Sequence, residues 1–125
     1  LGQGDSALQL YSHMLKEGVS PDVWTFVTIL QACSILADKE QISLVDNHFI
    51  KPICLDIVCA IHGDVKLKGF ASHSFVGNTL LITYGKCGNL TKATDIFCSL
   101  QNSNVITWNG MLSVYIEQGQ EDVAL

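Results

Sequence analysis

The sequence predicts an all-α fold, an α-solenoid of helix-turn-helix repeats. The clearest evidence is an internal repeat, in which five residues recur 31 positions later. Asn78, Leu81, Tyr84, Gly88 and Ala93 recur as Asn109, Leu112, Tyr115, Gly119 and Ala124. A fixed offset shared by unlike residue types indicates one structural unit used twice, and units of this length are typical of stacked helical repeats. A solenoid presents an extended surface built from the same position of each repeat, so binding is expected there and not in a closed cleft.

Two helices make up the expected unit in the second half of the chain. The first covers residues 74–86 and ends at Gly88, which tolerates the left-handed conformation of a helix end. The second covers residues 90–100. Apolar residues in both follow helical spacing: Val76, Leu80, Leu81 and Tyr84 in the first, and Ala93, Ile96, Phe97 and Leu100 in the second.

The first half repeats the same elements in the opposite order. Residues 1–18 supply a second helix, closed by Gly18 and followed by Pro21, and residues 23–34 supply a first helix. Their apolar positions keep the same steps: Ala7, Leu10, Tyr11 and Met14, then Phe26, Ile29, Leu30 and Cys33.

Composition sets broad limits on the class of protein. The chain has 125 residues, of which 48% are hydrophobic and 2 are proline, so it is not a disordered tail. No apolar run approaches the ~20 residues that a membrane span requires. The chain begins at Leu1 and stops within a new amphipathic pattern, so we expect an internal fragment without information on targeting.

The five cysteines show no paired spacing and are expected to be small buried residues in a reducing compartment. His48, Cys54, Cys59 and His62 lie within fifteen residues and are of zinc-ligand type. No Cys-x-x-Cys accompanies them, and the segment 54–60 is largely apolar. We therefore predict ordinary packing there, with no metal and no cofactor.

Three segments resemble plant pentatricopeptide repeat proteins, specifically the subclass that alternates standard (P), long (L) and short (S) repeats. They are GVSPD (18–22), VGNTLLITYGKCG (76–88) and VITWNGM (105–111). The resemblance implies four parts: residues 1–22 end a standard repeat, 23–73 form a long repeat, 74–104 a short repeat, and 105–125 begin a further standard repeat.

The long repeat at 23–73 has more residues than a long repeat of the family. We expect the additional residues to be an insertion at 42–59 within its second helix. This segment contains Pro52 and has apolar residues at almost every helical phase. One interpretation is a tolerated surface loop, because lengthening a loop costs little entropy. The apolar content leads us to favour translated non-coding sequence from an imperfect gene model.

The resemblance implies reading of single-stranded RNA, one base per repeat. In the family, the fifth and last residues of a repeat select the base. In the short repeat these are Asn78 and Asn104, a pair that implies a pyrimidine with cytosine favoured. Asp22 is the last residue of the opening repeat, and Asn109 is the fifth of the closing repeat. The long repeat supplies Val27 and His73, a weaker RNA-facing pair because valine cannot hydrogen-bond a base.

Each of these positions also has a purely structural interpretation. Asn104 lies where a turn is expected, and asparagine is common in turns. The amide of Asn78 could bond to nearby backbone. Phe26 and Trp108 stand just before the fifth residue, and we expect both to be core residues and not stacking platforms.

Charge weighs against tight RNA binding by this chain alone. The formal net charge is -5, and there is no arginine, whereas neutralisation of phosphates by Lys and Arg supplies most of the affinity for nucleic acid. We therefore predict negligible RNA affinity for the isolated chain.

The chain is not expected to be an enzyme. Some members of the subclass end in a cytidine-deaminase-like domain, but the His-x-Glu and Cys-x-x-Cys of that chemistry do not occur here. Such a domain would belong to a missing C-terminal part. The resemblance implies site recognition in organellar RNA processing or C-to-U editing, in mitochondrion or chloroplast. The expected partners are single-stranded RNA and editing proteins, with no membrane and no small-molecule substrate. The alternative is a protein-binding scaffold of the tetratricopeptide type.

Overall fold

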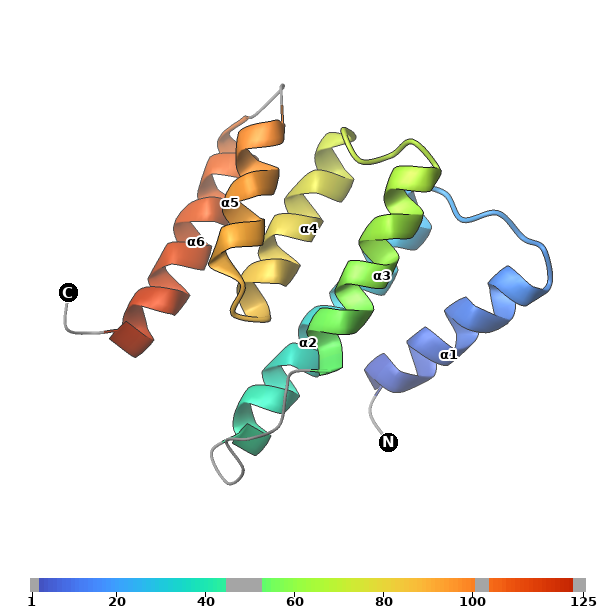
Figure 1. Cartoon of the computed structure of the whole chain (residues 1–125), viewed down its shortest axis with the longest axis horizontal. Coiled ribbons are helices and arrows are strands. Elements are labelled where there is room, and N and C mark those ends of the chain that lie inside the picture. The colour runs from blue at the N-terminus through green and yellow to red at the C-terminus, as the bar shows by residue number, and fades with distance from the viewer. Residues whose placement is uncertain (1–2, 45–52, 101–103, 123–125) are drawn as a thin grey trace.

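The computed structural model describes residues 3–44, 53–100 and 104–122, which form helices joined by short connections (Figure 1). The helices in chain order are α1 (Gln3–Lys16), α2 (Val23–Leu44), α3 (Ile53–Leu67), α4 (Ser74–Lys86), α5 (Leu90–Ser99) and α6 (Val105–Asp122). No strand occurs in the described ranges. The predicted all-α solenoid is confirmed.

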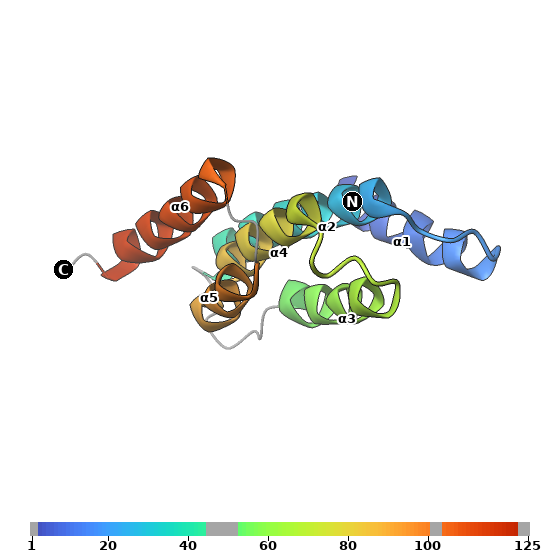
Figure 2. The same ribbon diagram turned by 90° about the horizontal axis from the view of Figure 1, so that it is seen from above.

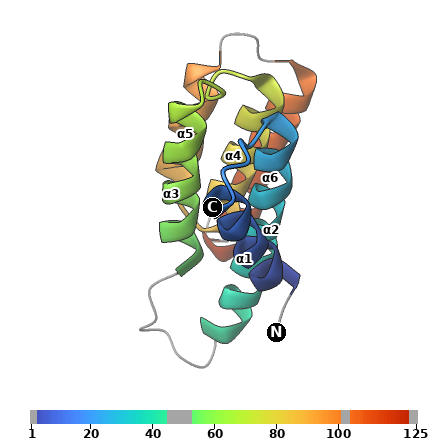
Figure 3. The same cartoon turned by 90° about the vertical axis from the view of Figure 1, so that its right-hand side faces the viewer.

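The helices form two rows. In the first row, α2 packs on α4 and α4 packs on α6, and all three run in the same direction with their N-terminal ends at one end of the molecule (Figure 1). In the second row, α3 and α5 lie on the other side of these helices (Figures 2 and 3). α1 packs against α2 at the edge of the stack. Elements that are neighbours in sequence are thus neighbours in space, as expected for a solenoid.

Three helices end in the same glycine motif. Gly18, Gly69 and Gly88 have φ of 82°, 82° and 83°, a conformation that residues with a Cβ rarely adopt. Next to Gly88, the Asn89 N–H donates to the Tyr84 carbonyl over 2.9 Å, and Gly88 N–H donates to the Gly85 carbonyl over 3.0 Å. This is the Schellman pattern, which satisfies the last carbonyls of α4. The glycines predicted to close the helices at 18 and 88 are therefore confirmed.

The core consists of the apolar stripes that helical spacing predicts. The predicted residues of α2 and α4 are buried: Phe26, Ile29, Leu30, Cys33, Val76, Leu80, Leu81 and Tyr84. Ala93 and Ile96 of α5 and its C-cap residue Leu100 join the same cluster, and Phe97 packs against it. The stripe of α1 is less complete, because Tyr11 is buried whereas Leu10 is 70% exposed. No described element covers the Leu10 side of this edge helix.

The segment expected as an insertion within a helix is arranged differently. α2 continues ten residues beyond its expected end to Leu44, and residues 53–59 form the first half of α3. Val58 is fully buried, and Leu55 and Ile57 pack against the core. Residues 42–44 and 53–59 are thus helical, and burial against the core accounts for the apolar Leu55, Ile57 and Val58. An insertion at 42–59 stays a prediction. Residues 45–52 lie outside the described part.

Two expectations about packing are also corrected. Trp108 is 56% exposed and touches Phe97 edge-on, with ring centroids 4.8 Å apart. Phe26, at the same position of its repeat, is buried between Tyr11 and Phe70. Within the described ranges no second aromatic covers Trp108 as Phe70 covers Phe26. Cys33 is buried as expected, whereas Cys59 and Cys98 are exposed.

The described residues contain neither a membrane-crossing helix nor a metal-binding cluster. No helix there is long and apolar enough to cross a membrane. No group of three or more histidine, cysteine, aspartate or glutamate side chains in that part is placed to hold a metal ion.

Candidate functional site

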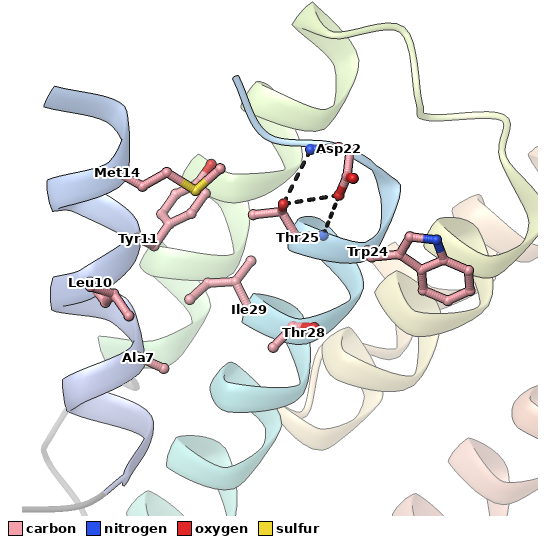
Figure 4. A pocket seen from close by; sticks show the side chains of 9 residues that line it. All are labelled: Ala7, Leu10, Tyr11, Met14, Asp22, Trp24, Thr25, Thr28 and Ile29. Atoms are coloured by element: carbon pink, nitrogen blue, oxygen red, sulfur yellow. Dashed lines mark hydrogen bonds between the residues drawn. The ribbon is translucent and has the colours of Figure 1, made fainter. Parts of the chain in front are cut away.

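The predicted last residues of the repeats share one structural role. Asp22, His73 and Asn104 each cap the N-terminus of the helix that follows. Asp22 Oδ1 accepts from the Thr25 N–H over 2.9 Å (Figure 4), and His73 Nδ1 accepts from the Phe75 N–H over 3.3 Å. Caps of this kind satisfy backbone donors that have no partner within the helix. The capped helices are α2, α4 and α6, so the three residues lie at one end of the first row (Figure 1).

Asn104 accepts from two backbone groups of α6. Its Oδ1 accepts from the Ile106 N–H over 3.0 Å and from the Thr107 N–H over 3.1 Å. Asn104 therefore has a structural role, as expected of a turn residue, because it caps α6. Capping occupies the amide oxygen and leaves the rest of this exposed side chain accessible.

Asn78 and Asn104 are brought together by Thr107. The Thr107 Oγ1 lies 2.6 Å from Asn78 Oδ1 and 3.3 Å from Asn104 Oδ1. Asn78 is only 7% exposed, so most of its side chain is enclosed where α4 packs on α6. Two predicted site residues 26 positions apart thus meet around one hydroxyl group.

The other predicted fifth residues differ from Asn78. Asn109 is exposed on α6. Val27 is half-buried and packs against the core, so it contributes apolar surface and no side-chain hydrogen bond. Asp22 and His73 lie at the caps described above. The short repeat is therefore the place where a predicted fifth and last residue share a hydrogen-bonded contact.

Sequence reasoning missed a row of exposed apolar residues beside the caps. Trp24, Phe75 and Ile106 each stand two positions after a cap, and they are 61%, 50% and 54% exposed. The ring centroids of Trp24 and Phe75 are 5.6 Å apart, and His73 stacks on Phe75 at 6.1 Å. Their common position within the repeat is the signal that could have identified them.

A groove of about 380 Å³ lies between α1 and α2 (Figure 4). Its walls are mainly apolar, with Asp22 and Thr25 at one end. Hydrogen bonds from the Thr25 backbone and side chain lower the pKa of Asp22, so this carboxylate stays ionised as a cap. The lining residues are Ala7, Leu10, Tyr11, Met14, Asp22, Trp24, Thr25, Thr28 and Ile29. Most of these side chains are apolar, so the groove has the character of a packing surface.

Buried polar contacts elsewhere join neighbouring helices. His62 Nδ1 lies 2.9 Å from the Tyr84 hydroxyl, which is 3.8 Å from Cys59 Sγ. Burial raises the pKa of Tyr84. It also raises the pKa of Cys33, to about 12. Tyr11 donates to Asp64 Oδ2 over 2.9 Å, and its pKa is raised by burial and by this carboxylate. Tyr11, Tyr84 and Cys33 are therefore protonated at neutral pH, and the contacts of the two tyrosines join α1 and α4 to α3.

The recurring hairpin, its capped first helices and its repeated exposed positions define the class: a repeat protein of the α-solenoid type. Two family models match, a PPR repeat family model at residues 1–34 and a PPR repeat model at residues 78–105.

Relatives in Arabidopsis thaliana agree. The pentatricopeptide repeat-containing protein At4g25270, chloroplastic, is 33% identical over 119 residues, covering 95% of this chain and 20% of its own length. The pentatricopeptide repeat-containing protein At5g15300 is 32% identical over 118 residues, which are 94% of this chain and 19% of that protein.

A third relative, the pentatricopeptide repeat-containing protein At4g31070, mitochondrial, is 27% identical over 124 residues, covering 99% of this chain and 17% of its own length. The chain therefore spans about a fifth of the length of these relatives. It belongs to the pentatricopeptide repeat family, and the predicted membership is confirmed.

Proposed function

We propose that the chain binds single-stranded RNA and reads one base with the pair Asn78 and Asn104 of its short repeat. The observation that carries the proposal is the meeting of these two amides at Thr107, where α4 packs on α6. Amides offer both a donor and an acceptor, which suits hydrogen bonding to a base edge. The same register places Asp22 and Asn109 as further base-selecting residues, and Val27 with His73 as a weaker pair.

The row of Trp24, Phe75 and Ile106 supports the proposal. Each side chain is at least half exposed at the N-terminal end of a first-row helix. Stacking of a base on an aromatic ring is worth about 1–3 kcal/mol and does not depend on which base is bound. These residues would supply affinity, while the amides beside them would supply base selection.

The end of the first row also favours an anionic ligand. The N-termini of α2, α4 and α6 lie together there, and a helix N-terminus carries partial positive charge. Lys68 also lies at this end and donates to Ser20 Oγ over 2.8 Å. This local potential offsets only part of a net charge of -5, so the RNA affinity of the isolated chain is still expected to be negligible without a tether.

The cellular location is inferred from the relatives. Several carry names that place them in the chloroplast or the mitochondrion, and we place this chain in one of these organelles. Within the subclass of alternating long and short repeats, it would act as the non-catalytic site-recognition part in RNA processing or C-to-U editing, alongside editing proteins.

A tethered binding assay tests the proposal despite weak affinity. The intact chain is joined by a short flexible linker to a domain that binds an RNA hairpin, and the hairpin is followed by a short single-stranded tract. The tether raises the local concentration to the millimolar range, so even weak reading of the tract adds measurable affinity. We expect tighter binding with a single-stranded tract than with a base-paired one. Equal binding with and without the tract would exclude RNA reading and favour the protein-scaffold alternative.

A further inference from the structure

The Thr107 hydroxyl stands between the two amides of the short repeat and has a single hydrogen to donate. It is 1% exposed, and its Oγ1 lies 2.6 Å from Asn78 Oδ1 and 3.3 Å from Asn104 Oδ1. The two amide oxygens therefore compete for one donor.

The contacts decide this competition. Asn104 Oδ1 already accepts two backbone N–H groups, from Ile106 and Thr107. Asn78 Oδ1 is the nearer of the two to the hydroxyl, and among the described residues Thr107 alone donates to it. The hydrogen of Thr107 therefore goes to Asn78.

This bond sets the orientation of the Asn78 carboxamide. With Oδ1 turned inward to Thr107, the Nδ2 amino group takes the other side. Across the described residues, every buried side-chain nitrogen or oxygen has a hydrogen-bond partner. No described group accepts from Asn78 Nδ2, so among the described residues this nitrogen is left available to a ligand. Capping orients the Asn104 carboxamide similarly: its oxygen faces the backbone N–H groups of α6, and its amino group points away from them.

In the two pairs of neighbouring repeats within this chain, the third residue matches in polarity the fifth residue one repeat earlier. Thr107 is the third residue of its repeat, and the third residue of the short repeat is Val76, which is fully buried. The fifth residue that precedes Val76 by the same logic is Val27, which is also apolar and packs against the core. A hydroxyl thus occurs with an amide and a valine with a valine, which agrees with a role of the third residue toward its partner.

We propose that Thr107 is a positioning residue for base selection: it fixes Asn78 with its amino group toward the ligand, so that Asn78 and Asn104 together present donors. This inference rests on the proposed RNA binding. Two donors match cytosine, whose Watson-Crick edge has the adjacent acceptors N3 and O2. Uracil interrupts its two acceptors with the N3–H donor, and adenine offers the single acceptor N1 between its amino group and a C–H.

The tethered assay tests the inference with homopolymer tracts, oligo(C) and oligo(A), on the intact chain. We expect the wild type to prefer oligo(C), and Thr107→Val to lower the oligo(C)/oligo(A) affinity ratio about fivefold or more, since the freed amide can present either end. Thr107→Ser keeps the hydroxyl and should keep the ratio. Thr91→Val is the control, because Thr91 is exposed on α5 in the other row of helices and contacts none of the proposed base-selecting residues. It should leave the ratio unchanged.

A ratio that survives Thr107→Val would overturn the role of Thr107 while leaving RNA binding intact. If the single-stranded tract did not change the affinity of the wild type for the RNA, the proposed RNA binding itself would be wrong. Should Thr107→Val fail to fold, NMR of the ¹⁵N-labelled wild type decides. Binding of oligo(C) should shift the side-chain NH₂ signals of Asn78 and Asn104, and unmoved Asn78 signals would overturn the proposed orientation.

Discussion

Gly85 of α4 lies so close to Val114 of α6 that no side chain fits between them. A Cβ on Gly85 would come within 2.6 Å of Val114 Cγ2, and Val114 is 3% exposed. One repeat earlier the same two positions hold Ser34 and Thr83, whose hydroxyl groups are 3.1 Å apart. The spacing of neighbouring first helices, and hence the distance between successive binding positions, thus depends on matched pairs of small residues.

Gly85→Ala is expected to destabilise the fold. Alanine favours helix over glycine by about 1 kcal/mol, but the added methyl must displace a buried valine in contact with α4. Overpacking of this kind costs about 1–3 kcal/mol, so the net free energy of unfolding should fall. Urea denaturation followed by circular dichroism measures the change.

Gly63→Ala is the control for that measurement, because a Cβ on Gly63 of α3 meets nothing within 4 Å. It should raise the free energy of unfolding by up to about 1 kcal/mol. Combining Gly85→Ala with Val114→Ala should cost less than the sum of the two single changes. If Gly85→Ala stabilised the chain as Gly63→Ala does, the close approach of α4 and α6 would be wrong.

Asn104→Ala should weaken the start of α6. It removes the oxygen that accepts from Ile106 and Thr107, and loss of such a cap costs about 1 kcal/mol. Asn104→Asp keeps an accepting oxygen and adds negative charge at a helix N-terminus, so it should retain the stability. Thermal unfolding compares the two variants, and equal melting temperatures for both would show that the cap contributes nothing.

The stability of the chain should fall as the pH drops from about 6.5 to about 4. Burial, followed by the charges of Lys66 and Lys92, lowers the pKa of His62 from 6.5 to about 4. Between these values the unfolded chain binds a proton at His62 that the folded chain does not, so acid favours unfolding. Because the imidazole is half-exposed, we expect a loss of about 1–2 kcal/mol, which is less than the full shift implies.

Thermal unfolding across this pH range measures the effect. His62→Gln keeps a polar partner for Tyr84 but cannot titrate, so its stability should depend less on pH in the same window. Identical pH profiles of the two proteins would show that His62 is not the source.

Trp24→Ala should reduce affinity for RNA more than stability. Trp24 is 61% exposed, and loss of one stacking platform is expected to cost about 1–3 kcal/mol of binding. Leu67→Ala is the control, since Leu67 is 85% exposed on α3 in the other row. In the tethered assay it should bind as the wild type does. Equal losses for both variants would place the ligand elsewhere.

Much of the fold could be predicted because it depends on local signals. Helical spacing of residues such as Leu80 and Tyr84, and the left-handed glycine at 88, mark each hairpin without reference to the rest of the chain. The first half of α3 escaped prediction because its apolar residues follow no single phase, and only tertiary packing shows that Val58 is buried.

The site could be predicted only in part. The resemblance supplied the positions of Asn78 and Asn104, but Thr107 joins Asn78 from 29 residues away, a contact that no local pattern signals. The exposure of Trp24 and Phe75 likewise depends on which faces the neighbouring helices leave open. Packing between repeats, and not the repeat itself, determines these features.

The most direct measurement compares the wild type with Asn78→Ala in the tethered assay, on oligo(C) and oligo(A) tracts. Asn78→Ala removes the amide that is proposed to select the base and leaves the cap at Asn104 in place. We predict that the wild type prefers oligo(C) and that the variant binds the two tracts nearly equally. A wild type without preference, or a variant that retains it, would contradict base selection by Asn78.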